Sequence, residues 1–453
     1  MFRLVCLMVF CGFVLVHCKV KQEFHFPEED KVDSVLVKLI ESKSKTGSIN
    51  EFILPDEDQW DKIPQDSTNP ITKAKVELGQ KLFFDPAISF NPKCEAAAGT
   101  FSCATCHFAD AGFSAGIHQA IAGGGRGFGH LRHKHPLCDS SLLDVQMIKT
   151  PSIVNCAYQE VMLWSGKFGC CGPNKGTDSL WPPGSFIELN KLGMSGVETQ
   201  ARVALEAHGM RMSPKLVTQT EYKPLFDSAY PKEREDLRYL RFTMARAIGA
   251  YERTVIANKA PFQKWIRGEE GSMSYNQKKG AILFFGKGNC VQCHRGPALN
   301  SMAFYALGMN EMEGPDVVTK QDSFTNVHLG RGALTKRKED EYCFKVPQLY
   351  NLKDHQYYGH GAGFCSIEEV IKYKNLAIAE NLKVPKSNLA KEFIPLNLTE
   401  TEIKLLVDFL ENALYDLDLK RYNPTTVPSG LCFPNADRLS RIQLACSDST
   451  KLK

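Results

Sequence analysis

Two short motifs in this chain combine a pair of cysteines with a histidine. Both have the spacing C-x-x-C-H, at residues 103–107 and 290–294. Two thiols separated by two residues can reach the two vinyl groups of one porphyrin and bind it as thioethers, and the adjacent histidine can bind the iron. A single C-x-x-C is also compatible with a zinc half-site or a redox pair, but two copies that each keep the histidine favour haem c. The sequence therefore predicts two covalent haems, attached through Cys103, Cys106, Cys290 and Cys293 and bound at iron by His107 and His294.

The same segment precedes both motifs. The pattern G-x-x-L-F-F occupies residues 79–84 and 280–285, and each copy continues a helical pattern. Ser274 and Gln277 form a capping-box start for the second of these helices. A repeated supersecondary unit indicates a duplicated domain. We therefore predict a mainly α-helical fold with two cytochrome c-type domains, each binding one covalent haem c, and an extended C-terminal tail.

The chain has 453 residues, which is enough for two such domains with extensions. Thr399 and Glu402 form a further capping box, and apolar residues from Ile403 to Leu414 recur on one face, which predicts a core helix. The predicted divisions are a signal peptide at 1–18, an N-terminal extension at 19–72, a first cytochrome c-type domain at 73–268, a second at 269–418 and a tail at 419–453.

The N-terminus is typical of an export signal. A basic start at 1–3 precedes an apolar run at 4–16 that is too short to span a bilayer, so we expect a periplasmic or cell-envelope protein. Residues 15–18 resemble a lipobox in which His17 is atypical, so a lipid anchor on Cys18 and an unanchored exported form both stay open. The net charge is only +4, and no block of like charges stands out, which gives no support for a nucleic-acid partner.

Sixteen cysteines in an exported chain indicate an oxidising compartment. Nine of them lie outside the signal segment and the two motifs, and because nine is odd, at least one is free or paired between chains. Cys432 and Cys446 can form a disulfide within the C-terminal tail. We expect the adjacent Cys170 and Cys171 to have separate partners, because a bond between neighbours is strained.

An ordered set of segments resembles the bacterial di-haem cytochrome c peroxidase family, which includes the MauG enzymes. Besides the two C-x-x-C-H motifs, the segments are L-G-x-x-L-F-F-D-P at 78–86, T-P-S-I-V-N at 150–155, L-W-S-G-K-F at 163–168, F-K-V-P-Q-L-Y-N at 344–351 and Y-Y-G-H-G at 357–361. The resemblance implies that hydrogen peroxide is reduced at the N-terminal haem. It also implies that electrons from a small c-type cytochrome or cupredoxin enter at the C-terminal haem. A homodimer is left open.

The resemblance also implies two catalytic residues. Trp164 aligns with a tryptophan that lies between the haems and helps electrons cross; a plain core aromatic is the alternative. Glu198 aligns with the catalytic glutamate over the first haem. Peroxide must lose a proton from one oxygen and gain one on the other as the O–O bond breaks, and a carboxylate in apolar surroundings can move that proton. The alternative for Glu198 is a carboxylate that stabilises a helix N-terminus, since a helix is expected from here to about His208.

Several positions depart from the family pattern. The distal histidine position of the first haem is Gly123, so we expect that haem to be five-coordinate or to have a displaceable ligand. The sixth ligand of the second haem falls at Lys374, with Tyr373 beside it, and both stay candidates. Lys149 occupies the position of a calcium-site asparagine, so a calcium ion is left open, and Glu188 replaces a pocket glutamine. A MauG-like oxidase that acts on a protein or small organic substrate, and a non-catalytic electron carrier, are the competing functions.

Overall fold

The computed structural model describes residues 24–318 and 326–446. The predicted signal segment at 1–18, including Cys18, lies outside the described residues. None of the helices in the described ranges is long and apolar enough to cross a membrane.

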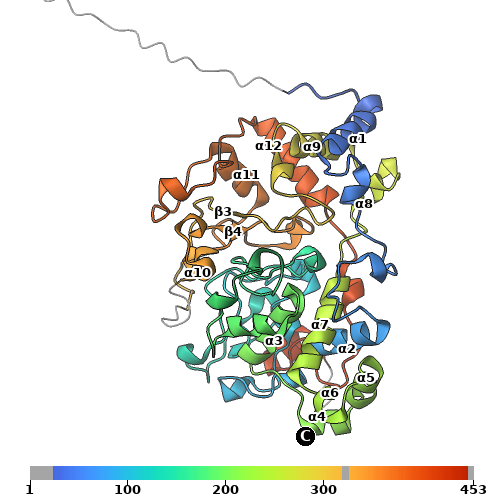
Figure 1. Ribbon diagram of the computed structural model, residues 1–453, viewed down its shortest axis with the longest axis vertical. Helices are drawn as coiled ribbons and strands as arrows, with labels where there is room; N and C mark the ends of the chain where they lie inside the picture. The colour runs from blue at the N-terminus through green and yellow to red at the C-terminus, as the bar shows by residue number, and fades with distance from the viewer. Residues whose placement is uncertain (1–23, 319–325, 447–453) are drawn as a thin grey trace, which may run out of the picture.

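The fold consists of short helices joined by turns, with very little sheet (Figure 1). The two sheets are antiparallel pairs, β1 with β2 and β3 with β4. This composition confirms the prediction of a mainly α-helical protein. The elements are α1 Val32–Lys43, α2 Lys73–Phe84, β1 Gly125–Arg126, β2 His133–Lys134, α3 Gly196–Ala207, α4 Pro214–Gln219, α5 Tyr222–Ala229, α6 Glu235–Arg238, α7 Arg241–Thr254, α8 Pro261–Ile266, α9 Tyr275–Phe285, β3 Phe304–Tyr305, α10 Gly332–Thr335, β4 Phe344–Lys345, α11 Ile367–Leu376, α12 Glu400–Asp408 and α13 Arg438–Gln443.

The two copies of G-x-x-L-F-F have the same structural role. Each copy ends the helix that precedes a haem motif, α2 in the first half and α9 in the second. A Cβ atom added to Gly79 would lie 1.9 Å from the carbonyl oxygen of Ala247 in α7, and one added to Gly280 would lie 2.1 Å from that of Leu405 in α12. Glycine is therefore required at both positions, because a second helix crosses there in backbone contact. The repeat seen in the sequence is a repeat of helix packing.

The predicted helix starts are also confirmed. Ser274 and Gln277 form a capping box at the start of α9, and Thr399 and Glu402 form another at the start of α12. After α12 the chain continues as a π-helical turn, Phe409–Ala413, whose apolar side chains complete the core over α9.

Both ends of the described chain pack against the half that is remote in sequence. Near the N-terminus, Asp33 in α1 pairs with Lys278 of α9 at 2.7 Å and accepts a hydrogen bond from Trp265 Nε1 at 2.6 Å. Near the C-terminus, Asn435 accepts a hydrogen bond from the Thr105 hydroxyl, inside the first haem motif, at 2.5 Å. The tail therefore contacts the first motif directly.

Two disulfides join described residues. Cys432–Cys446 closes the tail, as predicted, and Cys94–Cys138 joins two segments on either side of the first haem motif. Both bonds constrain the backbone around that motif, where regular secondary structure is sparse.

Candidate functional site: two haem-attachment motifs and the segment between them

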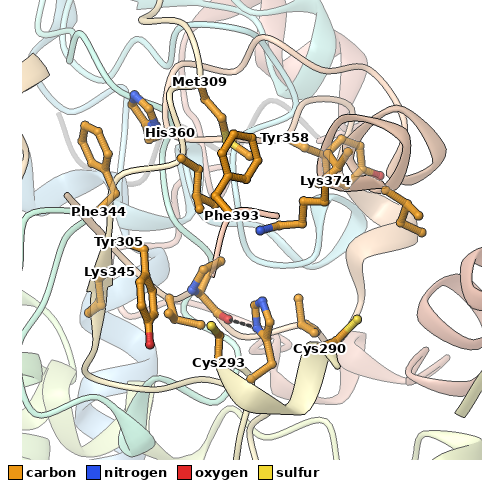
Figure 2. A pocket seen from close by; sticks show the side chains of 18 of the residues that line it. Cys290, Cys293, Tyr305, Met309, Phe344, Lys345, Tyr358, His360, Lys374 and Phe393 are labelled. Atoms are coloured by element: carbon orange, nitrogen blue, oxygen red, sulfur yellow. Dashed lines mark hydrogen bonds between the residues drawn. The ribbon is translucent and has the colours of Figure 1, made fainter. Parts of the chain in front are cut away.

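A cavity of about 740 Å³ lies over the second motif (Figure 2). Cys290, Cys293 and His294 form part of its wall, and apolar side chains form most of the rest. Cofactor sites in proteins typically enclose about 300–1,000 Å³ with mostly apolar walls. The cavity and its donor set therefore fit a covalently bound haem.

The histidine of this motif is held in one orientation. Its Nδ1 lies 3.0 Å from the carbonyl oxygen of Leu299 and 3.1 Å from that of Pro347, so Nδ1 donates to the backbone and Nε2 remains free to bind a metal. Burial lowers the pKa of His294 to about 4, which keeps the ring neutral, the form that binds iron.

Lys374 projects into the cavity from α11, on the side away from Cys290 and Cys293 (Figure 2). Burial lowers the pKa of its ammonium group. Within the described ranges, no hydrogen bond or salt bridge to a neighbouring residue is seen for it. Tyr373 points elsewhere, because its hydroxyl donates to the carbonyl of Leu307 at 2.5 Å and its ring packs on Phe364 and Phe393. Of the two candidates for the sixth ligand, only Lys374 faces the cavity.

The first motif has the same local construction. Cys103–Thr105 form a single 3₁₀ turn, and His107 Nδ1 lies 3.1 Å from the carbonyl oxygen of Phe113. Burial lowers the pKa of His107 to about 4. A recess beside Cys106, bordered by Arg132, is too small to hold a water molecule. The donor set of the first motif fits haem c, whereas a cavity of haem size is seen over the second.

Glu198 lies in the first turn of α3 and is fully buried. Arg253 of α7 binds it with two hydrogen bonds, from Nε at 2.8 Å and from Nη2 at 2.6 Å, and Asn69 Nδ2 donates at 3.2 Å. The structure thus shows a buried ion pair where the sequence suggested apolar surroundings. None of these partners belongs to the first haem motif, so the structure does not bring Glu198 into hydrogen-bond contact with it.

A second carboxyl group accompanies this ion pair. Burial, reinforced by the charge of Glu198, raises the pKa of Glu252 to about 8, so this side chain holds a proton at neutral pH. Sequence reasoning missed both Glu252 and Arg253, although the segment E-R-T directly follows the apolar run A-I-G-A-Y and places two adjacent charges at the end of that run, which is the signal that could have found them. Glu188, which stands where the family pattern has a pocket glutamine, is at the surface and pairs with Lys191 at 3.3 Å.

Trp164 lies where residues of the two halves meet. It lines the cavity of the second motif, and its Nε1 donates to the carbonyl of Lys149 at 2.8 Å. Its ring makes an edge-to-face contact with the ring of His360, with the ring centres 6.4 Å apart. The ring of His360 in turn stacks on that of Phe344, with the centres 3.6 Å apart. Trp164 and Lys149 come from the first half, and His360 and Phe344 from the second. The position of Trp164 is therefore compatible with a route for electrons between the two motifs.

Two buried lysines flank Trp164. Burial lowers the pKa of Lys149 to about 8 and that of Lys345 to about 7. Lys149 Nζ contacts the Ser114 hydroxyl at 3.1 Å, and Lys345 Nζ donates to the Val161 carbonyl at 2.5 Å. No group of three acidic, histidine or cysteine side chains that could hold a metal ion is found within residues 24–318 and 326–446. Lys149 stands at the sequence position where the family pattern has a calcium-site asparagine, and its Nζ is bound there by the Ser114 hydroxyl.

Comparison with known proteins identifies the class. The sequence profile of the di-haem cytochrome c peroxidase family matches residues 73–271. The chain is 30 % identical over 357 residues to the methylamine utilization protein MauG of Methylorubrum extorquens, an alignment that covers 77 % of this chain and 80 % of the relative. It is 26 % identical over 318 residues to the cytochrome c551 peroxidase of Pseudomonas aeruginosa, covering 68 % and 75 % of the two chains.

The chain belongs to the di-haem cytochrome c peroxidase and MauG family. Its fold is similar to that of a MauG-like protein associated with microbial copper homeostasis, with a TM-score of 0.56 and 21 % sequence identity over 81 % of this chain and 95 % of the other. Membership implies two haem c groups, and relatives named as peroxidases and as MauG are about equally similar to this chain.

Proposed function

We propose that this protein is a peroxidase that reduces hydrogen peroxide to water with electrons from a small c-type cytochrome or cupredoxin. The overall reaction consumes one peroxide, two protons and two reduced one-electron donors, and gives two waters and two oxidised donors. The observation that carries the proposal is the position of Trp164, in the cavity wall of the second motif and on a segment from the half that holds the first. This arrangement suits an enzyme in which one site receives electrons and the other uses them.

When bound, the two haems supply the electron transfer and the site of peroxide cleavage. The chain's own residues hold and position them: two thioether bonds at each motif, with His107 and His294 as iron ligands. Glu198 is the group that moves the proton between the two peroxide oxygens, and Arg253 positions its carboxylate. The neutral carboxyl of Glu252 is near enough to interact with this pair.

We further propose that the protein is exported and works in the periplasm or at the cell envelope, where a small redox protein can reach it. A disulfide-stabilised tail fits an oxidising compartment. Peroxide-dependent oxidation of a reduced c-type cytochrome by the full mature chain, prepared with covalent haem, tests the proposed activity.

A MauG-like oxidase that acts on a protein or a small organic substrate is the second candidate. The similarity to MauG of Methylorubrum extorquens and the lack of a methionine at position 374 favour it. A peroxidase oxidises the cytochrome donor in proportion to the peroxide consumed. An oxidase of this kind oxidises less of that donor for each peroxide consumed, because its oxidising equivalents pass to its own substrate.

Replacing Lys374 with methionine is expected to change the spectrum of the second haem. If the Lys374 amine is the sixth iron ligand, methionine replaces nitrogen with sulfur and raises the reduction potential, by on the order of 0.1 V. Low-temperature electron paramagnetic resonance and a redox titration measure the two effects. Tyr373→Phe is the matched control and should leave both unchanged. A shift in the tyrosine variant alone would assign the ligand to Tyr373.

Replacing Trp164 with phenylalanine is expected to slow electron transfer between the two sites and to lower steady-state turnover, while both haems stay bound. Phenylalanine keeps an aromatic ring in the wall but is much harder to oxidise and loses the N–H group that bonds to Lys149. Stopped-flow mixing of the reduced protein with peroxide measures the transfer. Trp181→Phe is a suitable control, because Trp181 is buried outside the cavity wall and its Nε1 donates to the Thr177 hydroxyl at 3.1 Å. Equal electron-transfer rates in Trp164→Phe and Trp181→Phe would show that electrons do not pass through Trp164.

A further inference from the structure

Cys170 and Cys171 are adjacent in the loop that follows Trp164, and neither forms a disulfide. Their sulfur atoms lie 2.7 Å apart. Cys171 is exposed and Cys170 is half-buried. We propose that this pair is a second peroxide-reactive site, separate from the haem motifs, in which hydrogen peroxide closes the two thiols reversibly into a disulfide between neighbours. The sequence suggested separate partners for the two cysteines, but the loop places each beside the other.

The surrounding loop holds the two thiols together. Asn174 Nδ2 donates to the carbonyls of Gly166 at 3.0 Å and Gly169 at 2.8 Å, which ties the residues on either side of the pair to each other. Arg331 in turn donates to Asn174 Oδ1 and to the Pro173 carbonyl, each at 2.7 Å. The loop is therefore constrained, so the closeness of the sulfurs is a property of the fold.

Other free cysteines outside the two motifs, in the described part of the chain, are poorly placed to react with peroxide and form a disulfide. Cys156 and Cys343 are buried, and their thiols contact the backbone carbonyls of Glu252 and Glu339. Cys365 is exposed and serves below as an internal reference. The paired arrangement is what separates Cys170 and Cys171 from a lone surface thiol.

The chemistry is a two-step oxidation. The Cys171 thiolate attacks one peroxide oxygen, so an S–O bond forms, the O–O bond breaks, and the leaving hydroxide takes up a proton as water. The Cys170 sulfur then attacks the Cys171 sulfur, so that an S–S bond forms and the S–O bond breaks; the proton of the Cys170 thiol passes to the departing hydroxide, which leaves as a second water. Burial, together with the contact to Cys171, raises the pKa of Cys170 to about 12, which makes the exposed Cys171 the attacking group.

The product should be easy to reduce. Neighbouring Cα atoms are about 3.8 Å apart across a trans peptide, less than the roughly 4.4–6.8 Å usual for a disulfide. The bond is therefore strained, and strained or exposed disulfides have more oxidising potentials than structural ones. A mild reductant should open it while Cys94–Cys138 and Cys432–Cys446 stay closed.

The test is to treat the full haem-containing protein with hydrogen peroxide, block free thiols with an alkylating reagent and digest with trypsin. Lys167 and Lys175 flank the pair, so one peptide, residues 168–175, contains both cysteines and no others. We expect this peptide to lose two hydrogens and both alkyl groups after peroxide, and to regain both alkylation sites after mild reduction. Cys365 should remain alkylated at the same peroxide dose.

In Cys170→Ser, the same peptide should lose the reversible closure, and a dione reagent that traps sulfenic acid should label Cys171. Full alkylation of both thiols at a dose that oxidises Cys365, or a peroxide-induced link between two chains through Cys171, would overturn the proposal. The alkylation state of this peptide is measured without following haem turnover. A negative result would therefore overturn the thiol proposal and leave the proposed peroxidase activity untouched.

Discussion

Replacing Glu198 with glutamine is expected to lower peroxide-dependent oxidation of a reduced c-type cytochrome by about 10²–10⁴-fold, the usual contribution of a positioned proton-transfer group. The amide has nearly the shape of the carboxylate but cannot take up and return the proton that peroxide cleavage requires. Steady-state turnover under saturating donor measures the effect. Haem content should change little, because glutamine can still accept a hydrogen bond from Asn69. The free energy of unfolding should fall, because the buried guanidinium of Arg253 loses its charged partner, so turnover is compared on protein that is fully folded.

Glu188→Gln is the matched control for this variant. Glu188 lies eight residues before α3 on the protein surface, where it accepts a hydrogen bond from the Gly184 backbone at 2.7 Å. Its substitution should leave turnover unchanged. Full activity in Glu198→Gln would contradict the role of this carboxylate and would leave the buried ion pair with Arg253 as its only function.

Replacing Arg253 with methionine is expected to lower the free energy of unfolding by about 3–5 kcal/mol, because it leaves a buried carboxylate without its partner. The side chains of Arg253 and Glu198 are only 3 % and 0 % exposed, and two hydrogen bonds join them. Arg253 also donates to the Pro64 carbonyl at 2.9 Å, so the variant loses a contact that ties the N-terminal segment to α7. Denaturant-induced unfolding of the haem-containing protein measures the change.

A double variant separates the loss of stability caused by the unpaired charge from the loss caused by poorer packing. Adding Glu198→Gln to Arg253→Met removes the stranded carboxylate, so we expect a substantial part of the lost stability to return. Arg202→Met is a control at an exposed ion pair, formed with Glu206 on the outer side of α3, where less than about 1 kcal/mol should be lost. A similar small loss for Arg253→Met would show that water reaches the Glu198 carboxylate.

The parts that could be predicted from sequence are those set by short-range patterns. The C-x-x-C-H spacing predicts both attachment sites within five residues each, and the capping boxes at Ser274 and Thr399 mark the helix starts that the structure has. The repeated G-x-x-L-F-F pointed to duplicated helices, but only the structure shows that its glycines mark the crossings of α2 with α7 and of α9 with α12.

The parts that could not be predicted depend on contacts distant in sequence. Glu198 and Arg253 are 55 residues apart, and nothing in either segment fixes which partner a buried carboxylate finds. The choice between Lys374 and Tyr373 depends on the rotation of α11, where one residue turns a side chain by about 100°, more than a short amphipathic pattern resolves. The closeness of Cys170 and Cys171 depends on a loop held by Arg331, which comes from the other half of the chain.

The measurement that tests the account most directly is the stoichiometry of peroxide consumption against oxidation of a reduced c-type cytochrome, made on the full mature chain after its covalent haem has been counted by the pyridine haemochrome method. The account predicts two haems per chain and two donors oxidised for each peroxide consumed, with turnover lost in Glu198→Gln. Two haems without donor oxidation, with several donors and with prior reduction of the protein, would contradict the peroxidase assignment and favour a MauG-like oxidase or an electron carrier.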